Sequence, residues 1–571
     1  MPIRRTFALQ NSWQRFTGVF ALLWLVTPFV SAQAQGDGAA STAFGKPAPP
    51  AQGSVDDDAF KRDLSAYAAR ARQAFEVPGL AVAIVHDGHV ILAQGYGMRR
   101  IGGSEPVTAH TRFQIASNSK AFTTASLAIL TDEGRLSWDD PVVRHLPDFQ
   151  MYDPYVTREM MVRDLLCHRC GLGLGAGDLL WWPKSDYTAD DVYHRLRAIK
   201  PATSFRSGFA YDNVMYGVAG RLFPAVAGKS WAAFVRERIF QPLKLNDTVA
   251  NITELDPEKD NVAAPHTKVN GKILAFPAFE HGPDPAGSIC SSVSDMATWM
   301  NVQLSGGFMP GDTDPAGGKP GKDLKRFRLF SAAAQREMWS PQTPLPGRSV
   351  SAYGLGWFLT PTETGNARQI THDGGLPGMV SRVTLVPERH LGIVVLTNYD
   401  GEKELGGGGE AMNAITEWVL RRYLAANGPD PIDTNQKGIA RVKSETNGVV
   451  ATLFAGRARD SKPSLPLSRY AGAYEDPWYG GTTITLAPDG KTLTLKFDHT
   501  PALQGTLEHF QYDTFVVRWK ERALDADAFV TFALTAEGKI EQFKMKAVSP
   551  TTDFSFDFQD LLFTPVTRKP L

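Results

Sequence analysis

The sequence predicts a mixed α/β (α+β) domain followed by a small all-β domain. Two β-rich runs lie over 80–97 and two more over 379–398, with helical patterns between them. One sheet built from both ends of the domain and covered by helices is the simplest arrangement that buries these strands. From Leu467 onward, short strand-like runs are separated by turn signals such as Pro488-Asp489-Gly490, a rhythm typical of a small sandwich or barrel.

The composition of the 571-residue chain is that of a globular, electrically neutral protein. Its 60 Lys and Arg balance 60 Asp and Glu, and 43% of the residues are hydrophobic. We therefore expect no nucleic-acid or anionic-lipid partner, because phosphate contacts need clustered positive charge. Three cysteines allow one disulfide at most, which excludes a disulfide-rich scaffold.

The N-terminus predicts a secretory signal peptide over 1–34. A stretch with three arginines and no acid precedes an apolar run over 16–30, and an A-x-A-like cleavage site ends at Ala34. The apolar run is shorter than the about 20 residues of a membrane span, and an uncleaved anchor is the alternative. We expect an exported protein, periplasmic or secreted, with no stable membrane span after cleavage. Residues 35–55, rich in Gly, Ala and Pro, predict a flexible linker.

The first domain is expected over 56–428. Apolar residues recur at helical spacing after Asp56, and His86-Asp87-Gly88-His89 predicts a hairpin turn between two strands. A further helix is expected to end at Gly134, and the middle of the domain, 140–300, reads as helices separated by loops rich in Pro and Gly.

Composition and hydrophobic periodicity also predict the elements at the end of the first domain and the C-terminal domain that follows. Residues 305–325 are rich in Gly, Pro and Asp and predict a surface insertion. Strands return over 353–360 and in the 379–398 hairpin, and a helix is expected over 411–427. Residues 429–465 are polar and predict a second linker, before an all-β barrel domain over 466–571.

Ser117-Asn118-Ser119-Lys120 is the first candidate for chemistry. This Ser-x-x-Lys occurs once, follows a β-like stretch and opens a long apolar helix. Residues i and i+3 of a helix share a face, so Lys120 would lie beside Ser117. A serine becomes a nucleophile when an adjacent base takes its proton, and a lysine serves if burial lowers its pKa. The alternative is an N-cap serine followed by an exposed lysine.

Two further motifs follow in the chain. Tyr211-Asp212-Asn213 runs into an apolar helix; a tyrosine could shuttle a proton if cationic neighbours lowered its pKa, and the amide could orient a substrate carbonyl. His372-Asp373-Gly374-Gly375 opens a glycine-rich run. Glycine has no Cβ, so the backbone there can approach another part of the protein or a ligand closely. The alternative for Tyr211 is a structural tyrosine at a helix start, and the alternative for the His372 run is a plain turn.

Together, the three motifs resemble the penicillin-binding serine hydrolases: class C β-lactamases, D,D-carboxypeptidases, D-aminopeptidases and their esterase relatives (peptidase family S12). That family has Ser-x-x-Lys, then Tyr-x-Asn, then Lys/His-x-Gly, and the resemblance covers about residues 58–425. It implies a β-lactamase/transpeptidase-like antiparallel sheet flanked by helices and a helical subdomain. The tail resembles the small C-terminal, lipocalin-like barrel of many such hydrolases, through LSRYAGAYE and its strand rhythm.

The resemblance implies catalytic and substrate-binding roles for the motif residues. Ser117 would be the acylated nucleophile, and Lys120 and Tyr211 would jointly act as base and proton relay. Asn213 would hold a substrate amide. His372 would take the Lys/His position on the edge strand. Two glycines complete the substrate-binding set: Gly374, which would leave room for substrate, and Gly375, whose N–H would form the oxyanion hole with that of Ser117.

The third motif departs from the Lys-Thr-Gly of the family's β-lactamases. A histidine is mostly neutral at pH 7 and lacks the fixed cation that attracts a β-lactam carboxylate, and Asp373 adds a negative charge beside it. The second departure is Asp212, where many relatives have a small Ser or Gly. The alternatives for this residue are that it tunes Tyr211 or that it only points to solvent.

We therefore expect an exported serine hydrolase acting through a Ser acyl-enzyme on ester or amide substrates. A peptidase or esterase is favoured over a potent β-lactamase. The alternatives are a β-lactamase or D,D-carboxypeptidase, and a catalytically silent binding or sensor protein on the same fold. The expected partner is a small-molecule or peptide substrate, and the oligomeric state is left open.

The cysteines predict neither a metal nor a cofactor. Cys167-His168-Arg169-Cys170 would need two further ligands to hold zinc, and no paired CxxC or HxxxH exists. Structural thiols or one local disulfide are the expectation there. Cys290 is expected in the buried core.

Overall fold

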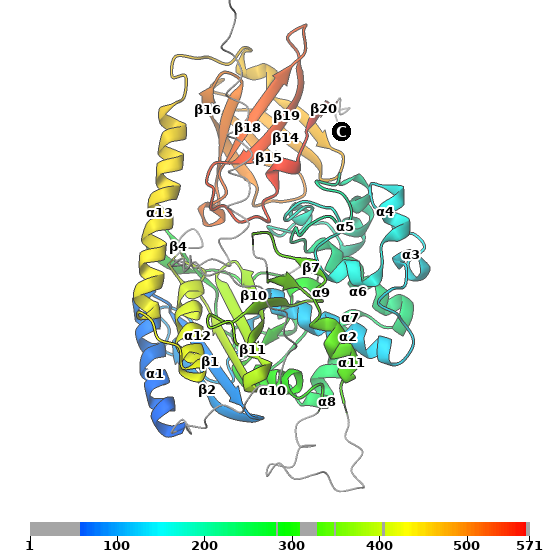
Figure 1. Ribbon diagram of the computed structural model, residues 1–571. Helices are drawn as coiled ribbons and strands as arrows, with labels where there is room; N and C mark the ends of the chain where they lie inside the picture. The colour runs from blue at the N-terminus through cyan, green and yellow to red at the C-terminus, as the bar shows by residue number, and fades with distance from the viewer. Residues whose placement is uncertain (1–56, 281–283, 309–327, 348–349, 402–405, 567–571) are drawn as a thin grey trace, which may run out of the picture. The chain divides into compact units, whose positions relative to one another are not determined.

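The structure is a computed structural model that describes residues 57–280, 284–308, 328–347, 350–401 and 406–566 (Figure 1). The expected signal peptide, the 35–55 linker and most of the predicted 305–325 insertion lie outside these residues. The chain divides into two compact units. The first ends at Tyr67 within helix α1 (Asp57–Ala74), and the second holds everything from Ala68 onward.

One eight-stranded antiparallel sheet is central to the second unit, and it combines strands from both ends of the domain, as predicted. Its strand order is β2-β1-β12-β11-β10-β9-β8-β7. The strands are β1 (Gly79–His86), β2 (His89–Gly97), β7 (Thr343–Pro344), β8 (Ala352–Tyr353), β9 (Phe358–Pro361), β10 (Arg368–Leu376), β11 (Met379–Val386) and β12 (Leu391–Thr397). Asp87 and Gly88 both have positive φ, 50° and 81°, which is the turn that Asp-Gly favours in a two-residue hairpin.

Helices α10 (Val293–Leu304) and α12 (Gly408–Leu424) pack against this sheet, α10 on β1 and β12 and α12 on β11 and β12 (Figure 1). Every residue of β12 is buried, as in a strand covered on both faces. Helix α2 (Ser119–Asp132) is buried from Ser119 to Leu130. It packs against four helices: α6 (Val214–Ala227), α7 (Trp231–Val235), α9 (Asp284–Gly287) and α11 (Ala332–Met338).

The remaining helices and short strands build the helical part of the domain, the β4–β5 hairpin and a two-stranded sheet of β3 and β6. These elements are α3 (Val142–His145), α4 (Pro154–Glu159), α5 (Ala189–Arg195), α6 (Val214–Ala227), α7 (Trp231–Val235), α8 (Gln241–Leu243), α9 (Asp284–Gly287), α11 (Ala332–Met338), β3 (Phe113–Gln114), β4 (His266–Val269), β5 (Lys272–Ala275) and β6 (Cys290–Ser291). Within the part of the chain that the structure describes, no helix has the length and apolarity needed to cross a membrane.

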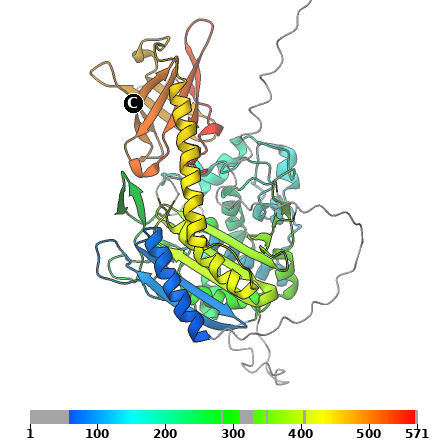
Figure 2. The same ribbon diagram turned by 60° about the vertical axis from the view of Figure 1, so that its left-hand side comes forward.

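The segment 429–465, which the sequence predicts as a linker, contains the 25-residue helix α13 (Pro431–Ala455), drawn as one continuous helix in Figure 2. Asp430 caps the helix by accepting from the Ile432 N–H, and Pro431 occupies its first turn. The polar composition and two internal glycines, Gly438 and Gly448, hide this helix from the sequence pattern.

The C-terminal domain is a near-closed antiparallel barrel in the order β19-β18-β17-β16-β15-β14-β13-β20. A bridge between Phe543 and Phe563 brings the two ends of the sheet together. Its strands are β13 (Gly472–Asp476), β14 (Gly480–Leu486), β15 (Leu493–Phe497), β16 (Gln504–Gln511), β17 (Thr514–Trp519), β18 (Ala528–Leu534), β19 (Ile540–Ala547) and β20 (Thr564–Val566).

Candidate active site

Ser117 is the one reachable residue of an otherwise buried segment. The structure describes all of 113–130, and every residue there except Ser117 is buried. Ala116, at φ 49°, turns the backbone between β3 and α2 in a conformation that residues other than glycine rarely adopt. The serine is thus held on a rigid helix start with its side chain partly open to solvent, as a nucleophile requires.

Lys120 lies beside Ser117, as helical spacing predicts. Its Nζ donates to Ser117 Oγ at 3.0 Å, to Asn213 Oδ1 at 2.7 Å and to the Ala286 carbonyl at 3.0 Å. Burial lowers the pKa of this amine to about 7, although two nearby carboxylates raise it. A substantial fraction of Lys120 is therefore uncharged at neutral pH and able to accept the serine proton.

Tyr211 lies against both the lysine and a buried histidine. Lys120 Nζ is 4.9 Å from the centroid of the tyrosine ring, and the His168 ring centroid is 4.1 Å from it. Burial raises the pKa of Tyr211 well above its usual value, and a hydrogen bond to Ser117 offsets this only in part. The lowered pKa that the sequence hypothesis made its condition is absent, because desolvation raises the pKa and three nearby carboxyl groups raise it further. The phenol therefore keeps its proton at neutral pH and is equipped to donate it.

Asn213 links Lys120 to a buried carboxyl group. While its Oδ1 accepts from Lys120, its Nδ2 donates to Asp178 Oδ2 at 2.8 Å. Burial raises the pKa of Asp178 to about 8. The amide keeps one N–H and one lone pair for the predicted contact with substrate. Asp178 lies 35 residues before Asn213, at the start of a short 3₁₀ helix (Asp178–Leu180), and no sequence motif marks it.

His372 lies on β10 with its ring buried. Its Nε2 is 2.9 Å from the Tyr353 hydroxyl, and its Nδ1 is 2.6 Å from the Asp373 carbonyl. Burial lowers the pKa of His372 well below 6.5, so the imidazole is neutral at physiological pH. Asp373 is the next residue of the strand, and its carboxylate accepts from Arg382 at 2.6 and 2.5 Å. Arg382 therefore compensates the negative charge of Asp373. Successive side chains of a strand point to opposite faces, so this carboxylate and the His372 ring lie on different faces of β10.

Strand β10 approaches the backbone before Ser117 very closely. A Cβ at Gly374 would come within 2.2 Å of the Ile115 carbonyl oxygen and 2.5 Å of Ser381 Oγ. Ser381 donates to that carbonyl at 2.7 Å. Gly374 thus makes room for the segment that carries the serine, and not only for substrate as the family resemblance implies. The next residue, Gly375, is exposed.

The Cys167–Cys170 loop packs against Tyr211 through the ring of His168. The three cysteines, all within the described residues, are buried and free, so the structure corresponds to the structural-thiol alternative. Cys170 Sγ donates to Asp212 Oδ2 at 3.4 Å, and the Asp212 N–H donates to His168 Nδ1 at 3.2 Å. Asp212 is buried and does not point to solvent. Sequence reasoning missed His168 as a partner of Tyr211, although the unusual cysteine spacing drew attention to its loop.

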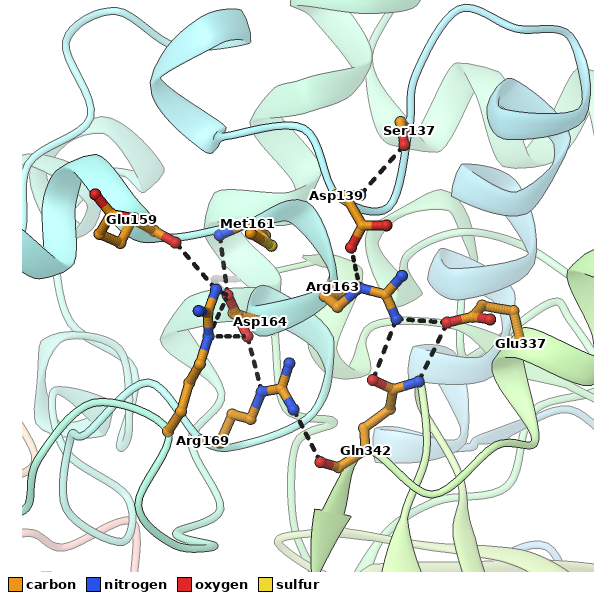
Figure 3. A network of polar contacts seen from close by, with 10 residues as sticks. Ser137, Asp139, Glu159, Met161, Arg163, Asp164, Arg169, Glu337 and Gln342 are labelled. Atoms are coloured by element: carbon orange, nitrogen blue, oxygen red, sulfur yellow. Dashed lines mark hydrogen bonds and ion pairs between the residues drawn. The ribbon is translucent and has the colours of Figure 1, made fainter.

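A polar network anchors this loop (Figure 3). Arg169 donates from Nε to Asp164 Oδ1 at 2.8 Å and from Nη1 to the Gln342 carbonyl at 2.9 Å. The Asp164 side chain is fully buried, and Arg206 donates to it as well. A buried carboxylate is tolerated only with such partners. The network therefore holds the loop that supports Tyr211.

Comparison with protein families matches two parts of the chain. A family model described as Beta-lactamase matches residues 66–415, and a Domain of unknown function (DUF3471) matches residues 456–565. The chain is 26% identical over 487 residues to Unguisins hydrolase ungD of Aspergillus violaceofuscus (strain CBS 115571), covering 80% of this chain and 82% of that protein. It is 24% identical over 326 residues to Protein flp of Staphylococcus aureus (strain NCTC 8325 / PS 47), covering 57% and 60%.

Two solved structures share the fold. The octameric penicillin-binding protein homologue from Pyrococcus abyssi has a TM-score of 0.53 at 19% identity, covering 88% of this chain and 99% of that one. The D-amino acid amidase from Ochrobactrum anthropi SV3 has a TM-score of 0.51 at 23% identity, covering 63% and 99%. The predicted β-lactamase/transpeptidase-like fold is thereby confirmed, together with the C-terminal barrel.

Proposed function

The chain belongs to the β-lactamase family, and from this premise we propose that it is a serine hydrolase that forms an acyl-enzyme on Ser117. The observation that carries the proposal is the 3.0 Å contact between Lys120 Nζ and Ser117 Oγ. A buried amine with a pKa of about 7 beside a partly exposed hydroxyl is the pairing that activates a serine.

The proposed reaction uses the described groups in sequence. Ser117 Oγ attacks the substrate carbonyl carbon while Lys120 Nζ takes the hydroxyl proton. The N–H groups of Ser117 and Gly375 would stabilise the resulting oxyanion, and each such donor is worth about 3–4 kcal/mol of barrier. Tyr211 donates its proton to the leaving alcohol or amine and is reprotonated from Lys120. Water then hydrolyses the acyl ester by the same proton path in reverse.

We propose ester or amide substrates rather than β-lactams as the preferred class. A site that selects a free carboxylate benefits from a fixed cation, and the third motif here presents a neutral imidazole. The name of one relative, a hydrolase of unguisins, agrees with hydrolysis rather than binding alone.

Export is a second part of the proposal, and it depends on the signal pattern over 1–34. N-terminal sequencing of the protein recovered outside the cytoplasm would test it. A mature N-terminus near Gln35 is expected, and an intact Met1 would contradict cleavage.

Intact-mass measurement after exposure to a fluorophosphonate tests the nucleophile. The wild type should gain one phosphonyl group, and Ser117→Ala should gain none. Ser126→Ala is the matched control, because Ser126 lies buried on the same helix and donates to the Phe122 carbonyl. Equal labelling of Ser117→Ala would overturn the assignment, and so would a folded wild type that never labels.

A further inference from the structure

A segment of the C-terminal barrel domain reaches the groups that surround Lys120. The Ser555 hydroxyl donates to Asp178 Oδ2 at 2.9 Å, and the Gly177 N–H donates to Asp557 Oδ2 at 2.7 Å. Both barrel residues are buried. The Phe554 ring centroid lies 5.8 Å from that of Tyr211 in an edge-to-face arrangement.

The loop that receives this segment is shaped for it. A Cβ at Gly175 would come within 2.4 Å of the Phe554 carbonyl oxygen, so the two backbones pack directly on each other. The Gly175 N–H in turn donates to the Tyr211 carbonyl at 2.8 Å. Gly175 is thus the single residue between the backbone of the barrel at Phe554 and the backbone of Tyr211, a proposed catalytic residue.

A second set of contacts fixes the barrel to the neighbouring loop and helix. The Asp186 N–H donates to the His499 carbonyl at 3.0 Å, and His499 Nδ1 lies 2.8 Å from Asp186 Oδ1. Arg195 Nη1 donates to the Trp478 carbonyl at 2.9 Å. Contacts at two separate places resist rotation of the barrel about either one.

We propose that the barrel completes the catalytic site, with Ser555 as a positioning residue that holds Asp178 and, through Asn213, the amine of Lys120. The geometry is one chain of hydrogen bonds: Ser555 and Asn213 both donate to Asp178 Oδ2, and Lys120 donates to Asn213 Oδ1 and Ser117 Oγ. This role rests on the proposed function, because it matters only if Lys120 activates Ser117.

Removal of the Ser555 hydroxyl acts through position and not through charge. Burial raises the pKa of Asp178 to about 8, so this acid already holds its proton where Lys120, with a pKa of about 7, titrates. Without the hydroxyl, Asp178 Oδ2 keeps only the Asn213 contact within the described part of the chain, and Asn213 is held less firmly against the Lys120 amine. The other titratable or charged groups that act on Asp178 and Lys120 are Asp212, His168, His372, Tyr211, Asp553 and Asp557.

The test is the pH profile of kcat/KM for p-nitrophenyl acetate in three serine variants of the full chain. Ser555→Ala should lower kcat several-fold at each pH with little change in KM, and should leave the acid limb near pH 7. Ser555→Thr, which keeps a hydroxyl, should restore the wild-type profile. Ser549→Ala is the matched control, because its hydroxyl contacts Thr551 within the same segment. Asp178→Asn should likewise lower kcat with little change in KM, which keeps the proposal testable if Ser555→Ala fails to fold.

An unchanged kcat in folded Ser555→Ala and Asp178→Asn would overturn the positioning role. Fluorophosphonate labelling in the same samples separates the two proposals. A wild type that labels at Ser117, combined with unchanged variants, defeats the inference alone. A wild type that does not label defeats the proposed function.

Discussion

Among single residues, Lys120 has the largest expected effect on activity. Its amine is buried and, among the residues that the structure describes, has no hydrogen bond to a carboxylate, and its pKa is about 7. The amine acts as a base only when unprotonated, so kcat/KM for an ester should rise with pH through about 7. Lys120→Met should lower kcat by at least about 100-fold, the lower scale of general-base catalysis. A pH–rate series on p-nitrophenyl acetate measures both effects. Lys184→Met, at an exposed lysine, is the control and should retain wild-type turnover.

His372 sets the expected substrate preference. Its neutral ring gives no fixed charge to a carboxylate, so the wild type should hydrolyse p-nitrophenyl acetate or a D-amino-acid amide with higher kcat/KM than nitrocefin. His372→Lys would introduce a cation at this position and should raise the ratio of nitrocefin to ester turnover. Faster nitrocefin than ester turnover in the wild type would reverse the preference. An unchanged ratio in His372→Lys would show that charge at this position does not set it.

Among the elements, strand β10 and helix α13 offer matched glycine substitutions. Gly374→Ala would place a methyl group 2.2 Å from the Ile115 carbonyl oxygen and must push the strand away from the serine's segment. We expect a Tm lower by several degrees, since overpacking costs about 1–3 kcal/mol, together with a large loss of ester turnover. Gly438→Ala, in α13 with open space around it, should be neutral or stabilising by up to about 1 kcal/mol. Thermal unfolding and turnover of both variants provide the measurement, and wild-type behaviour of Gly374→Ala would contradict the packing argument.

The sequence predicts those elements and contacts that depend on local spacing. Ser117 and Lys120 meet because they are three residues apart at one helix start, and Asp87-Gly88 makes its hairpin from two residues alone. Asp178 and Ser555 are 377 residues apart, and no local pattern records that they share a hydrogen bond. The raised pKa of Tyr211 escapes the sequence for a related reason: the proton-shuttle hypothesis considered neighbouring charge, whereas burial is a property of the whole fold.

At the scale of the whole molecule, two buried acids couple the barrel to the catalytic domain. Asp178 comes from one side of the contact and Asp557 from the other. Burial raises the pKa of Asp178 to about 8 and that of Asp557 well above 3.8. An acid whose pKa is raised by folding holds its proton in the folded state where the unfolded chain has lost it. Each group therefore favours folding at low pH and withdraws that stability as pH rises from about 4 through its folded-state pKa.

Asp557→Asn should reduce this pH dependence. The amide is neutral at every pH and keeps an oxygen that accepts from the Gly177 N–H, so the variant avoids the cost of ionising a buried acid. We expect its Tm to match that of the wild type near pH 5 and to exceed it by about 2 °C or more at pH 8. Thermal unfolding of the full chain across this range measures the difference. Glu541→Gln, at an exposed carboxyl on β19, is the control and should track the wild type throughout. A Tm difference for Asp557→Asn that stays constant or shrinks with rising pH would show that Asp557 is ionised in the folded protein, and the contact between the domains would then tolerate a buried negative charge.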